Sequence, residues 1–184
     1  MTRYIGPCSP EVRIAEEVCS QFIYVKIGRI DKDAARREVL TLLRLERELY
    51  QNYGLMLNHI CDMIDICSEN IYSHLDAIAD EVLTNGEVNW GRIVILCTFA
   101  AKLAIRCDQS GNNSMIEVII NWSGSLVAKK CSWIRESGGG WDGFIDQFSV
   151  RQPIIGTSGC WLHCFLAAAV IFGVLATIVL IKNS

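Results

Sequence analysis

One segment restricts the possible folds of this chain more than any other. Between residues 93 and 105 only Thr98 and Lys102 are polar. A run with so few polar positions predicts a helix that is buried on most of its sides. Arg92 stands directly before the run, after a Trp-Gly pair. A guanidinium at that place either caps a neighbouring helix or meets a carboxylate from outside the chain.

A second apolar segment lies at the far end of the chain. Residues 160–181 contain one histidine and no charged side chain. At about 1.5 Å per residue they would span a hydrocarbon core of about 30 Å. Trp161 suits the membrane interface, and Cys160 and Cys164 are either inert thiols or sites of a reversible acyl chain. We therefore expect residues 160–184 to form a transmembrane tail anchor, with the rest of the chain facing the cytosol; the alternative is a buried core helix.

Composition narrows the function classes. A chain of 184 residues holds one domain and its core, and a net charge of −3 does not favour nucleic acid as a partner. The nine cysteines form no Cys-x-x-Cys pair, and we find no signal peptide before them. They are expected to be small core groups in a reducing compartment. The three histidines lack the spacing of zinc ligands, so no metal and no cofactor is predicted.

Helical periodicity runs through the chain, and no segment alternates with period two. Ser9-Pro10-Glu11 has the residues of a helix start, and Gly28 marks the end of that helix. Further helices are predicted at 33–53, 69–83, from 90 onward, 115–130, 132–136 and 141–148. The fold class is therefore all-α, with one hydrophobic helix wrapped by amphipathic ones in residues 1–150, followed by a linker at 151–159.

Two motifs indicate a family. "NWGRIV" at 89–94 is similar to the first homology motif of the Bcl-2 family, and "SWIRESGGGWDGF" at 132–144 resembles the second. In this order, and with a tail anchor after them, they identify the chain as a member of that family by resemblance. The resemblance covers roughly residues 10–184 and implies a Bcl-2-like helical bundle in residues 1–150, followed by the linker and the tail anchor. Two departures are an additional glycine in the second motif and Ala100 where the family usually has glycine.

The family's third homology motif is altered here. Leu42, Leu45 and Leu49 keep its apolar spacing, but Glu46 and Arg47 stand where the family has Gly-Asp. This resembles the divergent survival branch, whose own third motif has lost that pair. It does not resemble the pore-forming members, which use the pair to dock on relatives.

The resemblance also implies a surface groove that receives an amphipathic BH3 helix from a pro-apoptotic relative, either BH3-only or Bax/Bak-like, to form a heterodimer. Arg92 would pair with an aspartate of that helix, Asn89 would add a hydrogen bond, and Gly91 would allow close approach. The apolar wall is expected from Ile78, Val82 and Leu83, and the floor from Val94, Leu96 and Phe99.

The expected function is that of a non-enzymatic survival factor. It would restrain permeabilisation of the mitochondrial outer membrane, from the surface of the mitochondrion or the endoplasmic reticulum. A pro-apoptotic pore-forming effector of the same fold is the alternative.

Other interpretations of single residues stay open at this stage. A tail-anchored hydrolase would use Cys61 or Cys67 with His59, although no motif orients such a pair. Arg92 could pair within the chain, with Glu87 or Asp142. The tryptophans of the two motifs, and the apolar residues assigned to the groove, could all be core residues.

Overall fold

The computed structural model describes residues 10–66, 71–84 and 88–149, without the side chains of 81–84. Over these residues the chain is helical and contains no strand, which confirms the all-α prediction. The elements are α1 (Pro10–Lys26), the short 3₁₀ helix η1 (Lys32–Ala34), α2 (Arg37–Asp62), α3 (Ile71–Thr84), α4 (Trp90–Gln109), α5 (Asn113–Ala128), α6 (Cys131–Glu136) and α7 (Gly140–Gln147).

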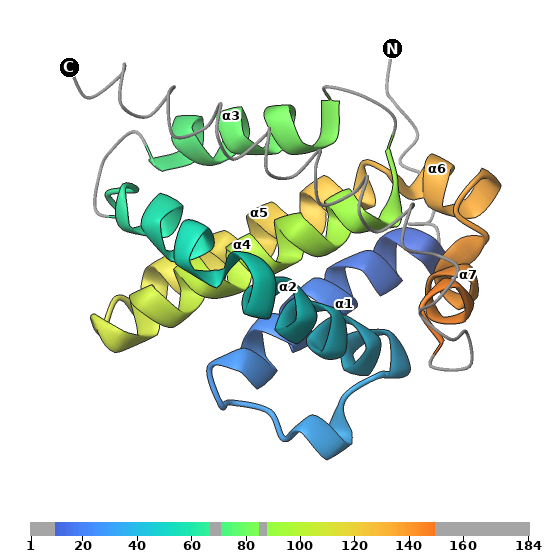
Figure 1. Ribbon diagram of the computed structural model, residues 1–184, viewed down its shortest axis with the longest axis horizontal. Helices are drawn as coiled ribbons and strands as arrows, with labels where there is room; N and C mark the ends of the chain where they lie inside the picture. The colour runs from blue at the N-terminus through green and yellow to red at the C-terminus, as the bar shows by residue number, and fades with distance from the viewer. Residues whose placement is uncertain (1–9, 67–70, 85–87, 150–184) are drawn as a thin grey trace, which may run out of the picture.

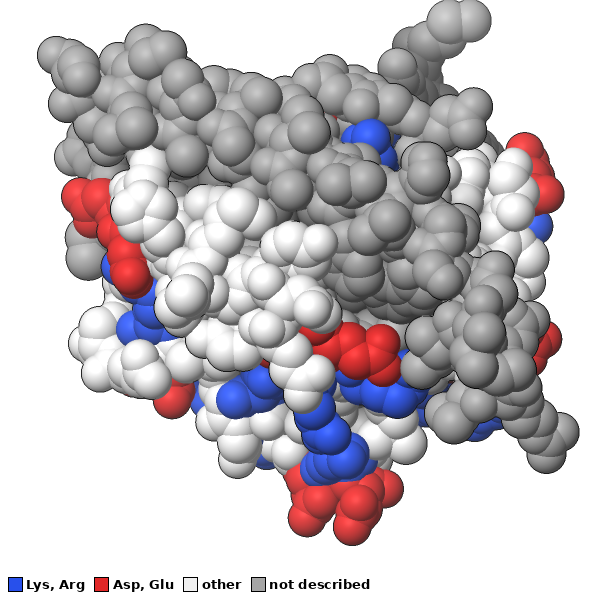
Figure 2. Space-filling view, in the orientation of Figure 1, with Lys and Arg blue, Asp and Glu red and all other residues white. Residues whose placement is uncertain are grey.

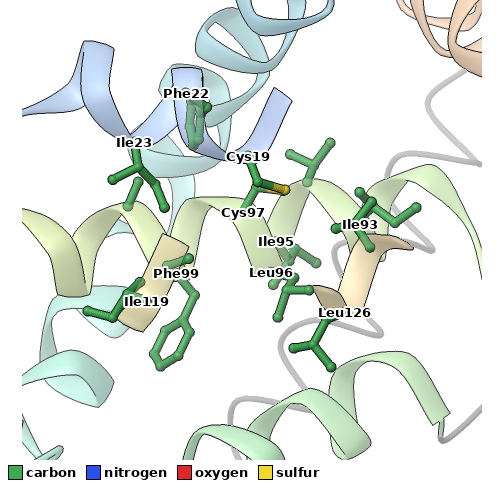
Figure 3. Close-up of a cluster of buried hydrophobic side chains, with 14 of the residues drawn as sticks. Cys19, Phe22, Ile23, Ile93, Ile95, Leu96, Cys97, Phe99, Ile119 and Leu126 are labelled. Carbon is green, nitrogen blue, oxygen red and sulfur yellow. The ribbon is translucent and has the colours of Figure 1, made fainter. Parts of the chain in front are cut away.

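Helix α4 is the centre of the bundle. Every residue from Trp90 to Ala101 is buried, and α1, α2, α3 and α5 all pack against this helix. Figure 1 shows α4 crossing the middle of the molecule, with α2 in front of it and α3 above. Phe22 and Ile23 of α1 and Ile119 of α5 lie around it in the close-up of Figure 3. The prediction of a helix buried on most sides is confirmed.

Helix α2 differs from its predicted range of 33–53 at both ends. It begins at Arg37, because residues 32–34 form the separate η1 turn. It continues to Asp62, because Leu57 and Ile60 extend its buried stripe beyond Gly54. Gly54 does not end the helix: a Cβ there would lie 3.1 Å from the ring of Tyr50, so a close contact explains the glycine.

The last three helices begin close to their predicted positions. The loop expected at 108–114 is shorter, because α4 runs to Gln109 and α5 begins at Asn113. In the second motif α7 begins at Gly140 rather than at Trp141, and Gly139 has a positive φ of 72°. A Cβ on Gly143 would lie 2.5 Å from the carbonyl oxygen of Gly138, so this turn admits only glycine there.

The cysteines in the described ranges are core residues, as predicted. Cys19, Cys61, Cys97, Cys107 and Cys131 are all buried. The sulfur of Cys19 lies 3.9 Å from that of Cys97, between α1 and α4. Both the hydrogen bond to Cys97 and burial raise the pKa of Cys19 above its ordinary value.

The predicted linker and tail anchor, residues 151–159 and 160–184, lie outside the described residues. None of the helices that are described combines enough length with enough apolar character to cross a membrane.

Candidate functional site

The first turn of α4 carries the polar residues predicted for the site. Asn89 is the N-cap, in an extended conformation, and its side-chain oxygen accepts a hydrogen bond from the backbone N–H of Arg92 at 3.0 Å. This bond satisfies one of the N–H groups that a helix start leaves without a partner. Asn89 therefore helps to fix the backbone from which Arg92 projects.

Arg92 lies at an electrostatically unfavourable place for a cation. Only 8% of the residue is exposed, and it stands in the first turn of α4, at the positive end of the helix dipole. Local helix stability therefore does not explain an arginine here. Gly91 beside it is also buried. Of the carboxylates considered as internal partners, Glu87 lies outside the described residues.

The two sequence motifs meet at Trp90. Its ring centroid lies 5.4 Å from Trp133, 5.3 Å from Trp141 and 4.9 Å from Phe144. Its indole N–H donates to the carbonyl oxygen of Gly138 at 3.0 Å. The second motif thus forms an aromatic cage, defined here as Trp133, Trp141 and Phe144, that holds the start of α4. The tryptophans are packing residues.

The predicted apolar residues converge in the core. Ile78 on α3 and Val94, Leu96 and Phe99 on α4 are all buried. Val82 and Leu83 belong to α3, but their side chains lie outside the described part of the structure. The wall and floor come from adjacent helices, as expected, and their binding role stays a prediction.

A hydrogen bond that the sequence analysis missed joins α3 to α5. The indole N–H of Trp122 donates to a carboxylate oxygen of Asp76 at 3.3 Å. Trp122 also packs edge-on against Phe99, with centroids 6.4 Å apart. An exposed aspartate and a tryptophan 46 positions later carry no spacing signal, so only the fold reveals this pair.

The altered third motif lies on α2 and faces the bundle. Leu42, Leu45 and Leu49 are buried, and Arg47 is exposed. Glu46 is 6% exposed and forms an ion pair with the ammonium of Lys26 on α1 at 3.0 Å. Sequence reasoning noted Glu46 as a departure from the family motif but gave no reason to pair it with Lys26.

The hydrolase alternative loses support from the geometry. Cys61 is buried, and burial raises the pKa of its thiol to about 12, so the nucleophilic thiolate is not favoured at neutral pH. His59 is exposed on the same helix, two residues away, and residues at that spacing do not face each other. Cys67 lies outside the described residues. Among the side chains that are described, no group of three His, Cys, Asp or Glu could hold a metal ion.

Comparison with known proteins gives a family match. The family described as "Apoptosis regulator proteins, Bcl-2 family" matches residues 42–141. Apoptosis regulator BAX from Bos taurus is 33% identical over 39% of this chain and 37% of its own length. Bcl-2-related ovarian killer protein homolog A from Danio rerio is 33% identical over 52% of this chain and 46% of its own. Bcl-2-like protein 1 from Rattus norvegicus is 24% identical over 61% and 51%. The chain thus spans about half, or less, of the length of these relatives.

A solved structure has the same fold. The Trichoplax adhaerens protein trBcl-2L2, crystallised with trBak BH3, superposes with a TM-score of 0.65. The superposition covers 76% of this chain and 99% of that one, at 20% sequence identity. At this level of identity the likeness concerns the fold.

Proposed function

Because this chain belongs to the Bcl-2 family, we propose that it is a survival-type apoptosis regulator that binds the BH3 helices of pro-apoptotic relatives. The partner helix would lie between α3 and α4, on the residues named above as wall and floor. The proteins that supply this helix would be BH3-only and Bax/Bak-like relatives, with which the chain would form heterodimers. Capture of such helices would restrain permeabilisation of the mitochondrial outer membrane.

The observation that carries this proposal is the position of Arg92. Arg92 stands in the first turn of α4, at the positive end of the helix dipole, where a cation adds nothing to helix stability, and its backbone N–H is held by the Asn89 cap. The aromatic cage around Trp90 packs against the same turn. A cation whose backbone is fixed by a helix cap and by an aromatic cluster is well placed to bind a carboxylate of a partner. The trBcl-2L2 structure with a Bak BH3 segment supports a helix as that partner.

The burial of the third motif on α2 supports a protein that receives BH3 helices over one that offers its own third motif to relatives. The apolar face of the third motif is buried, and Glu46 is tied to Lys26. To serve as a ligand, α2 would have to expose three leucines and break that ion pair. A pore-forming member must make its third motif available to relatives, whereas a receptor need not.

A pore-forming effector is the second candidate, because BAX and the ovarian killer protein are among the relatives at 33% identity. The relatives include both pro- and anti-apoptotic members, so sequence likeness does not choose between them. The Glu46–Lys26 pair is the feature that favours the survival assignment.

Membrane attachment is a separate part of the proposal. Residues 160–181 have the length and apolar character of a tail anchor that would hold the chain at the mitochondrial or reticular surface, facing the cytosol. Removal of residues 160–184 should release the protein from the membrane pellet after alkaline extraction. A truncated chain that stays in the pellet would contradict the anchor.

The function is tested by two assays on the full chain in nonionic detergent. A BH3 peptide with its aspartate should bind in calorimetry, and the same peptide with asparagine at that position should bind much more weakly. In the second assay the detergent is first removed, the chain is combined with dye-loaded liposomes and an activated effector, and it should reduce dye release. Release caused by the chain alone would establish the effector alternative instead. No binding of either peptide would exclude the groove.

A further inference from the structure

A cavity lies at a different place from the predicted groove, where α1, η1, α2 and α4 meet. Its volume is about 410 Å³, which is within the range of small-molecule sites. Its lining combines four cations and one carboxylate with apolar and neutral polar groups: Lys26, Lys32, Arg47, Lys102 and Glu46, with Val25, Leu43, Tyr50 and Gln51. Figure 2 shows a band of Lys and Arg side chains across the lower half of this face, with Asp and Glu side chains above and below it.

The charges of the lining do not balance. Its carboxylate, Glu46, is already paired with Lys26 at 3.0 Å. Lys32, Arg47 and Lys102 form no ion pair with any carboxylate among the residues that the structure describes. Like charges that converge around a partly enclosed space repel each other more strongly than on open surface. The cavity therefore favours an anion.

The ring of Tyr50 fixes the position of one of these cations, Lys102. The ammonium of Lys102 lies 3.8 Å from the centroid of the Tyr50 ring, and the Tyr50 hydroxyl accepts a hydrogen bond from Asn58 at 2.8 Å. The ring thus holds Lys102 by a cation–π contact while its ammonium lines the cavity. Lys26 is held by its ion pair with Glu46. Two cations are preorganised, and two others, Lys32 and Arg47, are exposed at the rim.

We propose that this cavity binds a small, multiply charged anion that bears phosphate groups. A carboxylate would neutralise one of the three cations that have no carboxylate partner, whereas phosphate groups carry more charge and more acceptor oxygens. Arg47 can bind phosphate through two parallel N–H donors, and lysines bind it as point charges. The phosphate could belong to a soluble compound or to the headgroup of a phosphoinositide lipid.

The site is distinct from the groove for the partner helix. Lys102 and Arg92 stand on the same helix, ten positions apart, which corresponds to about 15 Å along its axis. Occupation of the cavity would not place a ligand on Arg92. Anion binding can therefore be measured whether or not the proposed function holds.

The first test uses a soluble probe. The full chain in nonionic detergent is titrated with inositol trisphosphate in a calorimeter, with inorganic phosphate as the simpler probe. The double variant Lys32→Gln/Arg47→Gln should bind inositol trisphosphate at least about tenfold more weakly than the parent, because two charge-assisted contacts are lost. The matched control is Arg37→Gln/Lys129→Gln, which removes the same charge from exposed positions that do not line the cavity.

The second test needs no variant and distinguishes the two sources of phosphate. Lysine acetylation by an amine-reactive reagent is measured by mass spectrometry, with Lys129 as the internal reference. Inositol trisphosphate should protect Lys32 and Lys102 if a soluble compound suffices. Protection only by phosphatidylcholine vesicles that contain phosphatidylinositol bisphosphate would assign the site to a lipid headgroup.

Three results would overturn the proposal. One is equal loss of binding in the cavity variant and the control variant. Another is equal protection by vesicles in which phosphatidylserine supplies the same total charge. The third is no protection of Lys32 and Lys102 by either source.

Discussion

Helices α1 and α3 both present a buried apolar stripe to α4, but they are attached to the bundle in different ways. α1 packs on α2, α4, α5 and α6. Polar contacts add to this: Lys26 pairs with Glu46, and the Tyr24 hydroxyl donates to Glu117 on α5 at 2.9 Å. The main packing partner of α3 is α4, and the Asp76–Trp122 hydrogen bond links it to α5.

The difference indicates which wall of the proposed groove can move. Displacing α1 would break contacts with four helices, whereas displacing α3 would break mainly its packing on α4 and its hydrogen bond to Trp122. Local opening of this kind draws on the least strongly attached elements of a fold. Because the predicted floor residues are buried, we expect α3 to be the element that moves when a partner helix binds.

The largest expected effect is on global stability. Phe22→Ala in α1 should destabilise the chain by about 3–5 kcal/mol, because it leaves a cavity in the centre of the core. The change in α3 is Leu75→Ala, which removes fewer atoms than Phe22→Ala and should fall near the lower end of about 2–5 kcal/mol, since α3 also packs mainly on one helix. Urea unfolding of the full chain measures both, and a larger loss for Leu75→Ala would reverse the comparison.

Arg92→Ala tests the first turn of α4. Binding of an aspartate-bearing BH3 peptide should weaken by about 2–5 kcal/mol, the usual loss when a close charge pair in an interface is broken. Calorimetry measures this, with Arg135→Ala on the exposed face of α6 as the control. Unchanged affinity with an intact circular dichroism spectrum would show that Arg92 has a structural role only.

Lys26→Met tests the attachment of α1. It leaves the buried Glu46 carboxylate without its ion-pair partner, which should lower stability by about 1–3 kcal/mol. Lys26→Met/Glu46→Leu should recover most of that loss, because the uncompensated charge is also removed. Thermal unfolding measures the difference, and an equal loss in both variants would mean that packing, not charge, attaches Lys26.

Asp76→Ala tests the attachment of α3. Loss of its hydrogen bond to Trp122 should cost about 0.5–1.5 kcal/mol, and the effect should be local. Hydrogen exchange of the α3 amides should become faster while exchange in α1 is unchanged. Equal acceleration in both helices would mean that α3 does not open independently.

The smallest effect at neutral pH comes from the buried thiols. The pKa of Cys61 is raised to about 12 by burial, and that of Cys19 on α1 is raised as well. A raised pKa in the folded state gives stability that is present below the ordinary thiol pKa of 9.0 and is lost as the pH rises toward the folded value. The free energy of unfolding should therefore fall above pH 9.0, and that of the Cys61→Ala variant should fall less steeply. A parallel decline in both chains would remove Cys61 as a cause.

The hydrophobic periodicity was enough to predict the core, because the burial of a helix face determines which positions are apolar. The run around Val94 and Leu96 could only be the central helix, and the structure confirms it. The end of α2 was not predicted, because a glycine such as Gly54 usually weakens a helix. The structure shows that the residue is glycine because a Cβ there would crowd the ring of Tyr50. A contact of this kind depends on a rotamer, which the sequence does not show.

The candidate site was predictable where a motif specifies it and not where distant helices meet. Asn89 as a cap and Arg92 after it follow from adjacent residues, and the cap is confirmed. The Trp90 contact with the second motif, and the Asp76–Trp122 bond, arise from packing between helices. Single-sequence patterns carry no signal for such pairs, because side chains from different helices meet without a fixed spacing.

The environment of Trp122 gives the molecule an intrinsic fluorescent signal. Its indole is largely buried at the junction with α3, so separation of α3 would admit water and shift its emission to longer wavelength. Trp90, Trp133 and Trp141 lie in a separate aromatic cluster, close enough to share excitation energy. A red shift on adding a peptide without tryptophan that is lost in the Trp122→Phe variant would therefore follow the movement of α3 with no label attached.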